Sequence, residues 1–262
     1  MMTDPRFFCS PAQIVLGPDL SLELPEGPGR HAARVLRLEA GDGLVLFDGQ
    51  GGEYPARIER VTKDRVQVRI GAHRAVERES SLDLTLIQAL QGGDKMDFTL
   101  QKAVELGVRR FQPVASRRSV VRLDGERAAK RLDHWQGVAV AACEQCGRNR
   151  IPQVLPVQAL EQALAREAAE AAAPEAAAGG AQALRLVLLP EAAVPLTALP
   201  PPAGPVVFLV GAEGGLAPEE SAAALAAGFT PVRLGPRILR TETAGLAAVA
   251  AMQALWGDFR EE

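Results

Sequence analysis

The sequence predicts an α/β protein in which a small β-barrel precedes a larger parallel sheet. Apolar runs such as Val206–Val210 are too short for a core helix and rich in β-branched residues, which is typical of strands buried on both faces. From about residue 82 such runs alternate with helical patterns, as they do in a parallel sheet with crossover helices. The first 75 residues contain short strands separated by turn signals instead, which favours a barrel.

The predicted barrel has strands over 43–47, 54–61 and 65–70, separated by the turn sequences DGQGGE and TKD. Ahead of them, RHAARVLRL (30–38) predicts a short helix with an apolar side. Its polar residues are Arg30, His31, Arg34 and Arg37. A solvated helix face would explain these charges as well as a binding surface would.

A polar linker over 72–82 (AHRAVERESSL) divides the chain into predicted domains 1–75 and 76–262. Asp94 is expected to cap the first helix beyond it and Gly107 to follow its end. The alanine- and glutamate-rich stretch 167–183 receives no function. The elements expected are, in order, a strand over 82–90, a helix over 95–106, a strand over 110–114, a helix over 127–146, strands over 151–157, 184–189 and 206–210, a helix that begins at Pro218 and ends at Gly228, a strand over 230–234, and a last helix over 244–256.

Two glycine-rich turns predict a ligand site. FLVGAEGGL (208–216) and LGPRILRTETAG (234–245) each follow a predicted strand, so both should open at the same edge of the sheet. Gly214 and Gly215 lack the Cβ atoms that would keep a ligand away from the backbone, which favours recognition by main-chain groups. The Walker pattern and the GxGxxG fingerprint are both absent, and no acidic ribose ligand follows about 20 residues later. A dinucleotide dehydrogenase is therefore disfavoured.

These two segments resemble the cofactor-binding end of the SPOUT methyltransferases, whose chain forms a trefoil knot around S-adenosylmethionine. GGDKMDFTLQKAVEL (92–106) and AVAACEQCGRNR (139–150) are similar to the RsmE group of that superfamily, which methylates N3 of a uridine in small-subunit ribosomal RNA. The first domain resembles the PUA-type barrel used for RNA contact. The resemblance covers nearly the whole chain, but Ala212 stands where the family usually has proline.

The resemblance implies an S-adenosylmethionine site made mainly of backbone groups. Arg240 and Glu242 are the expected catalytic residues, because uridine N3 must lose a proton while negative charge develops on the flanking carbonyl oxygens. The alternative is that these two side chains only pair with each other or bind backbone. Thr241 and Thr243 are expected to cap the last helix and to contact the cofactor. The expected cofactor-binding residues are Leu189, Gly211, Glu213, Gly214, Gly215, Leu216, Leu234, Gly235, Ile238, Leu239, Arg240, Thr241 and Thr243.

Charge is distributed unevenly along the chain. The net charge is −3, but residues 1–150 hold 23 Lys and Arg against 20 Asp and Glu, whereas residues 151–262 hold 6 against 12. Contact with 16S rRNA or the small ribosomal subunit is therefore expected mainly from the first part. The resemblance also implies a homodimer, with 244–256 in the interface. The expected RNA-binding residues are Arg30, His31, Arg34, Arg37, Arg148 and Arg237.

Other protein classes are disfavoured by composition. With 47% apolar and 23% charged residues, the chain has the composition of a soluble globular protein. It has neither a membrane-length apolar run nor a signal pattern, so a cytoplasmic location without membrane attachment is expected. Three cysteines do not make a disulfide framework, and the lone CxxC of Cys143 and Cys146 is weak support for zinc. We therefore expect no metal.

Two alternatives to uridine N3 methylation stay open at this point. Relatives with the same knot methylate a ribose 2′-hydroxyl, and a protein of this fold could also serve as a non-catalytic RNA-binding factor in ribosome assembly. Identification of the methylated nucleoside distinguishes ribose methylation from uridine N3 methylation. The lack of any methyl transfer would indicate the non-catalytic factor.

Overall fold

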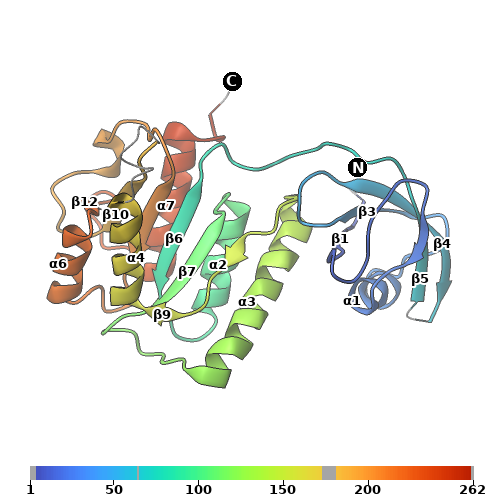
Figure 1. The fold of residues 1–262 in the computed structure, drawn as a ribbon, viewed down its shortest axis with the longest axis horizontal. Coiled ribbons are helices and arrows are strands. Elements are labelled where there is room, and N and C mark those ends of the chain that lie inside the picture. Colours follow the sequence, from blue (N-terminus) through green and yellow to red (C-terminus); the bar gives the residue numbers. More distant parts are fainter. Residues whose placement is uncertain (1–3, 64, 173–180, 261–262) are drawn as a thin grey trace. The chain divides into compact units, whose positions relative to one another are not determined.

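The computed structural model describes residues 4–63, 65–172 and 181–260 (Figure 1). The chain folds into two compact units. The N-terminal unit comprises Met1–Glu79 together with Val140–Ile151, and the sheet unit comprises Ser80–Ala139 together with Pro152–Glu262. The end of the long helix and the loop that follows it thus pack with the N-terminal unit, which the sequence patterns did not suggest.

The N-terminal unit is built on a five-stranded sheet in the order β1-β3-β4-β5-β2. All neighbours are antiparallel except β1 and β3. Alternation explains the core: in β5, Val66, Val68 and Ile70 are buried while the residues between them are exposed. The strands are β1 Arg6–Phe8, β2 Ser21–Glu23, β3 Gly43–Phe47, β4 Tyr54–Thr62 and β5 Arg65–Ile70, and the helical segments are α1 Glu26–Arg30 and the π-helical η1 His31–Val35.

The sheet unit contains a seven-stranded sheet whose main order is β12-β10-β11-β6-β7-β8, with β9 also paired to β7. All of these pairs are parallel, so the predicted parallel α/β fold is confirmed. Of the predicted strand over 151–157 only β8 forms, and β9 follows at Gln158–Ala159, because Pro156 between the two has no N–H for the ladder. The strands are β6 Leu84–Ala89, β7 Arg110–Ala115, β8 Gln153–Val154, β9 Gln158–Ala159, β10 Leu184–Leu188, β11 Val206–Val210 and β12 Thr230–Val232.

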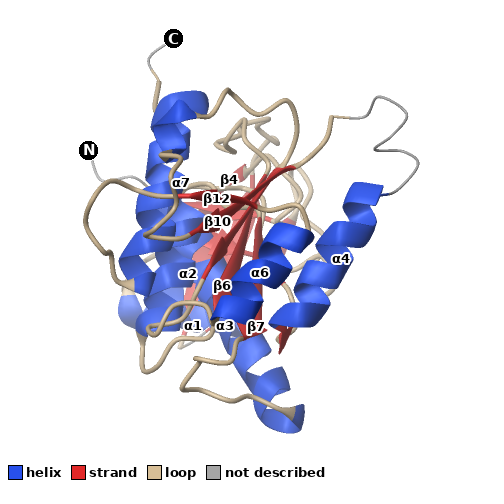
Figure 2. Cartoon of the chain, turned by 90° about the vertical axis from the view of Figure 1, so that its left-hand side faces the viewer, coloured by secondary structure: helices blue, strands red, loops and turns tan. Residues whose placement is uncertain are grey.

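Helices cover both faces of this sheet, with α2 and α7 on one side and α4 and α6 on the other (Figure 2). On the α4 side, Leu160 and Leu164 pack in one buried cluster with Ile87, Val187 and Leu209 of the strands. Among the described residues, no helix has the length and apolar character needed to cross a bilayer. The helical segments are α2 Lys95–Glu105, α3 Gly125–Cys146, α4 Leu160–Ala172, η2 Leu196–Ala198, α6 Pro218–Ala226 and α7 Thr241–Trp256.

Two helix ends differ from the prediction. Asp94 occupies the N-cap position of α2, but its side chain makes no capping hydrogen bond. Gly107 does follow the end of α2 with φ 93°, as expected. Helix α7 begins at Thr241, three residues before the predicted start, because the polar residues Thr241–Thr243 already adopt helical geometry. Of the stretch 167–183, α4 includes the first part, and residues 173–180 lie outside the described residues.

Candidate active site

A cavity with a volume of about 620 Å³ lies at the carboxyl ends of β10, β11 and β12. Both glycine-rich turns line it, so the two segments predicted to share a site do meet. All the residues predicted to bind a cofactor line this cavity except Thr243, which is exposed on the first turn of α7. Arg237 and Glu242 line it as well.

The first turn is shaped by glycine. A Cβ atom on Gly211 would lie 2.9 Å from the backbone of Gly215 and Leu216, so a larger residue would force the turn apart. Gly215 has φ 72° and donates its N–H to the carbonyl of Ala212 at 2.8 Å. The tight turn therefore forms with alanine at position 212 and presents backbone groups to the cavity.

Glu213 connects this turn to the end of β6. Its Oε1 accepts hydrogen bonds from the Gly92 N–H at 3.1 Å and from Lys95 Nζ at 3.4 Å. Burial acts to raise the pKa of Glu213, but the hydrogen bonds from Gly92, from its own N–H and from Lys95 outweigh it and lower the pKa below its usual value. Glu213 is therefore a carboxylate at neutral pH, and it fixes Lys95 at the cavity wall.

Thr241 connects the second turn to the first. Its Oγ1 donates to the Gly211 carbonyl at 2.5 Å and accepts from Gln88 Nε2 at 3.0 Å and Gln91 Nε2 at 3.2 Å. The Gln91 amide is held in turn by Thr99, whose hydroxyl donates to Oε1 at 2.9 Å. The prediction that Thr241 and Thr243 cap α7 is wrong, since no side chain caps this helix and the Thr241 hydroxyl is used in the buried network.

Arg240 and Glu242 do not pair with each other. Arg240 is exposed at the cavity, with φ −64° and ψ 151°, and forms no ion pair with a described residue. Glu242 Oε1 lies 3.7 Å from Lys95 Nζ, while its Oε2 is buried without a hydrogen-bond partner among the described residues. The site thus holds a guanidinium free to bind an anion and a carboxylate oxygen free to accept a proton.

Lys95 and Arg118 are among the cavity residues that the sequence analysis did not predict. Lys95 is the first residue of α2 and follows the Gly92-Gly93 turn at the carboxyl end of β6. This position after a predicted strand could have placed Lys95 at the site, because the carboxyl ends of parallel strands meet at one edge of the sheet. Arg118 follows β7 at the same edge and donates to the Gly214 carbonyl at 2.7 Å.

In the N-terminal unit, the predicted RNA-binding residues Arg30, His31, Arg34 and Arg37 are all exposed. The His31 ring also packs edge-on against Phe7, with ring centroids 5.6 Å apart. The structure therefore leaves these four side chains on the surface, and their role in RNA contact stays a prediction.

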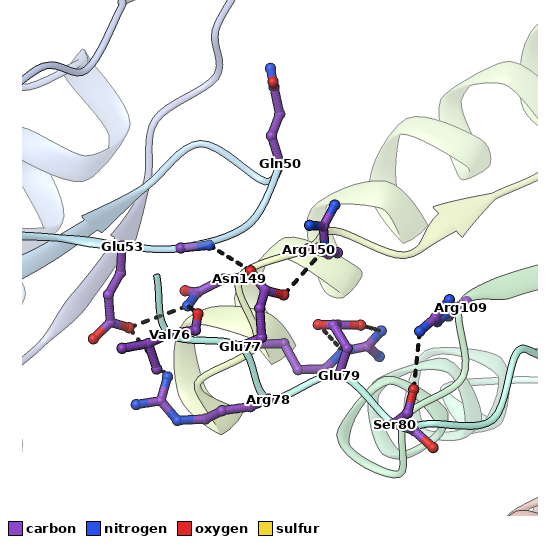
Figure 3. Close-up of polar contacts among 12 residues, drawn as sticks. Gln50, Glu53, Val76, Glu77, Arg78, Glu79, Ser80, Arg109, Asn149 and Arg150 are labelled. Atoms are coloured by element: carbon purple, nitrogen blue, oxygen red, sulfur yellow. Dashed lines mark hydrogen bonds and ion pairs between the residues drawn. The ribbon is translucent and has the colours of Figure 1, made fainter. Parts of the chain in front are cut away.

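The prediction that Arg148 binds RNA is contradicted by its burial. Arg148 is only 3% exposed, and its guanidinium is bound in two places by Glu79, through Nε at 3.1 Å and Nη2 at 2.5 Å. Releasing this buried pair to bind phosphate would leave a carboxylate buried without its partner, which is strongly unfavourable. Arg150 is exposed and pairs with Glu77 at 3.2 Å (Figure 3).

The two cysteines of the CxxC motif are not bonded to each other. Burial raises the pKa of Cys143 to about 12, and its Sγ donates to the Arg150 carbonyl at 3.6 Å. In the described part of the chain, no three His, Cys, Asp or Glu side chains gather in a way that could hold a metal ion. The motif thus contributes to the packing of the 147–150 loop.

Two family models match the chain. Residues 78–253 match the model described as "RNA methyltransferase domain", and residues 26–71 match the one described as "RNA methyltransferase PUA domain". Two proteins named "Ribosomal RNA small subunit methyltransferase E" are similar over most of their length. The Mycobacterium bovis protein is 34% identical over 87% of this chain and 84% of its own, and the Bacillus subtilis protein is 31% identical over 85% of each.

Solved structures agree with this similarity. A ribosomal RNA small subunit methyltransferase E from Neisseria gonorrhoeae, bound to S-adenosyl methionine, is 44% identical, covers 98% of this chain and 100% of its own, and superposes with a TM-score of 0.87. A putative methyltransferase from Legionella pneumophila, in complex with the bound cofactor SAM, is 37% identical with the same coverage and a TM-score of 0.87.

Proposed function

This chain belongs to the RNA methyltransferase family, and on that premise we propose that it transfers a methyl group from S-adenosylmethionine to N3 of a uridine in 16S rRNA. The observation that carries the proposal is the cavity of about 620 Å³, with Arg240 and Glu242 in its wall. This volume is within the range of small-molecule sites. A cofactor there would meet main-chain groups of both turns.

The residues present fit S-adenosylmethionine. Gly211 lies where any side chain would collide with the backbone of the same turn, and the exposed Gly214 and Gly215 leave the wall open. Leu189 and Leu239 add apolar surface beside these glycines. Such a site suits an adenosine group recognised by backbone N–H and C=O groups, and the bound cofactor supplies an electrophilic methyl group on a sulfonium.

The proposed catalytic roles follow from the Arg240 guanidinium and the Glu242 Oε2 atom, which have no charged or hydrogen-bonding partner among the described residues. Uridine N3 must lose its proton before its lone pair can attack the methyl carbon. As the new nitrogen–carbon bond forms, the carbon–sulfur bond would break and its electron pair would leave with the sulfur. The unpartnered Oε2 of Glu242 is the proton acceptor in this proposal. The Arg240 guanidinium, which no described carboxylate neutralises, faces the uracil oxygen on which negative charge develops.

RNA contact is proposed for Arg30, His31, Arg34 and Arg37 in the N-terminal unit and for Arg237 at the cavity. All five side chains are exposed, and four are permanently charged. A 16S rRNA substrate, free or within the small subunit, would place the protein in the cytoplasm.

A homodimer is part of the proposal. Helix α7 keeps half-exposed apolar residues, among them Leu246 and Leu255, and Phe98 on the adjoining α2 is 48% exposed. Apolar side chains gathered on neighbouring helices are typical of an interface. Light scattering on the purified chain tests this, since a monomer mass at micromolar concentration would contradict it.

We also propose the trefoil knot that the resemblance implies. In its support, the segment after β12 returns to the turn after β11, where Thr241 binds Gly211, before α7 begins. A threaded backbone of this kind would hold both turns around one cofactor.

The decisive experiment is to incubate the protein with labelled S-adenosylmethionine and undermethylated small ribosomal subunits and to identify the modified nucleoside by mass spectrometry. N3-methyluridine is the expected product. A ribose-methylated nucleoside would assign the chain to 2′-hydroxyl chemistry instead. No transfer at all, with RNA binding intact, would favour a non-catalytic assembly factor.

A further inference from the structure

The segment 116–124 (SRRSVVRLD), which we call the arginine loop, connects β7 to α3 in the sheet unit (Figure 1). Because β7 runs parallel to β6, which pairs with β11, the loop emerges at the same edge of the sheet as the cavity. Three of its nine residues are arginines. The sequence analysis assigned it no function.

One side of the arginine loop is anchored. Val121 and Leu123 are half-buried and line a cavity of about 140 Å³ with the buried Trp135 of α3. The residues that alternate with them, Val120 and Arg122, are exposed. This alternation is that of an extended segment with an inner and an outer side, so packing against α3 holds the outer side chains toward solvent.

The loop borders the proposed cofactor cavity directly. Arg118 lines the cavity, and a Cβ atom on Gly214 would lie only 3.2 Å from Arg118 Cβ. A Cβ atom on Gly92 would lie 3.5 Å from Val120 Cγ2 and 3.8 Å from Glu213 Oε1. The start of the loop therefore lies over the first glycine turn and beside the carboxylate that holds Lys95.

The charges of the loop are only partly neutralised. Arg117 pairs with Glu219, and its N–H donates to Glu220 Oε1 at 2.7 Å. In the described ranges, neither Arg118 nor Arg122 forms an ion pair, and the one partner of the Arg118 guanidinium is a neutral carbonyl. Most of the five N–H groups of Arg118 stay free at the rim of the cavity.

From this geometry we infer that the arginine loop binds the phosphates of the RNA strand next to the target nucleotide, with Arg118 and Arg122 as the contacts. The inference rests on the proposed function and extends its RNA surface to a second part of the chain. A planar guanidinium that is not committed to a carboxylate can bind phosphate in a bidentate manner. A nucleotide that enters the cavity would bring its flanking phosphates to this rim.

The test compares wild type with the Arg118→Gln/Arg122→Gln variant, using a protein-free transcript of small-subunit ribosomal RNA as the probe. RNA affinity is measured over a series of salt concentrations. The slope of log affinity against log salt should fall by about 0.7 for each phosphate that the variant no longer neutralises, as for single strands. In methyl-transfer assays KM for RNA should rise roughly tenfold near physiological salt for the double variant, and Arg122→Gln, whose side chain does not line the cavity, should keep the wild-type kcat at saturating RNA.

Arg117→Gln is the matched control, since it removes an arginine of the same loop whose charge Glu219 already neutralises. It should keep the wild-type salt slope. Affinity for S-adenosylmethionine is measured for all three proteins, and unchanged values show that the turn held by Arg118 is intact. If the double variant has a lower affinity for the cofactor, the same measurements are made on Arg122→Gln alone, because the Arg122 side chain does not contact the turn.

The outcomes separate this inference from the proposed function. If wild type transfers methyl groups and the variants keep its RNA affinity and salt slope, the inference is overturned while the function stands. If wild type transfers no methyl group, the proposed function is wrong, and the RNA-affinity series still shows whether the arginine loop binds RNA. A weakening seen with assembled subunits but absent with the protein-free transcript would indicate a ribosomal protein as the partner and overturn the inference.

Discussion

Thr241 donates its hydroxyl hydrogen to the carbonyl oxygen of Gly211 at 2.5 Å, and this hydrogen bond joins the two glycine-rich turns of the cavity. Both ends are buried, and the same hydroxyl oxygen accepts from the amides of Gln88 and Gln91. The residue before Thr241 and the residue after it are the proposed catalytic pair. The position of both therefore depends on one buried hydroxyl.

Thr241→Val should weaken cofactor binding about tenfold and lower stability by about 1–3 kcal/mol, because valine leaves the Gly211 carbonyl and two buried amides without this partner. Thr241→Ser keeps the hydroxyl and should restore both. Calorimetric titration with S-adenosylmethionine and thermal denaturation measure the two effects. Thr243→Val, at an exposed position of the same helix, is the control. Wild-type affinity in Thr241→Val would remove the network from cofactor binding.

Arg240→Ala should lower kcat by roughly 100-fold to 1,000-fold, as expected when a group that stabilises a developing oxyanion is removed. The fold should persist, since Arg240 is exposed and forms no ion pair with a described residue. Initial rates at saturating RNA and cofactor, together with the melting temperature, check both points. A variant with wild-type kcat would exclude Arg240 from the mechanism.

Arg34 and Arg37 are both exposed at the end of η1. Replacing both by alanine should weaken RNA binding and flatten its salt dependence, by about 0.7 to 0.9 in slope for each phosphate that is no longer neutralised. Filter binding over a salt series is the measurement. An unchanged slope would locate the RNA surface of this protein elsewhere.

Glu53→Gln should destabilise the N-terminal unit by about 3 kcal/mol at neutral pH, because it leaves the nearly buried Arg6 without its 2.7 Å ion pair. Burial acts to raise the pKa of Glu53, but hydrogen bonds from Arg6, Arg78 and Asn149 outweigh it and lower the pKa. The stabilisation is thus present above the ordinary carboxyl pKa and is lost as pH falls through the lowered value.

Urea denaturation at several pH values measures this difference in the free energy of unfolding between wild type and Glu53→Gln. The difference should be constant from about pH 8 to about pH 5 and should shrink below about pH 4. Glu59→Gln is the control, since Glu59 pairs with the exposed Arg69 on the surface. A difference that grows in acid would contradict the assigned role of Glu53.

Burial raises the pKa of Cys9 and Cys143 to about 12 each, so both remain protonated thiols at pH 8. A thiol reagent should therefore modify the half-buried Cys146 first and reach Cys9 and Cys143 only after denaturant is added. Mass spectrometry of the modified peptides shows the order in which the three cysteines react. Equal rates for all three cysteines would show that the N-terminal unit opens readily.

The sequence predicted the parts of the fold and the site that depend on local patterns. Short apolar runs marked the parallel strands, and the glycines of 211–215 and 234–235 marked the turns that line the cavity. In each case the determinant is a few adjacent residues, such as Gly211, whose missing Cβ allows the close approach of Gly215.

What the sequence did not reveal depends on partners far apart in the chain. Arg148 looked like a surface arginine in a CGRNR stretch, but its partner Glu79 lies 69 positions away. Lys95 and Arg118 take their places at the cavity through Glu213 and Gly214, 118 and 96 positions away. No periodicity or local spacing carries such pairings, so Arg148 was misplaced, and for Lys95 and Arg118 the one local signal was their position after strands that end at the cavity.

The interleaving of the two units limits how this protein can be divided or recombined. The 140–151 segment supplies the Glu144 carboxylate that binds the Phe8 N–H at 2.9 Å and the Asn149 amide that binds the Val76 carbonyl at 2.6 Å. A chimaera that exchanged only the first 79 residues with those of a relative would combine one protein's strands with another's helix end. A functional exchange of the N-terminal unit must therefore transfer both stretches of chain together.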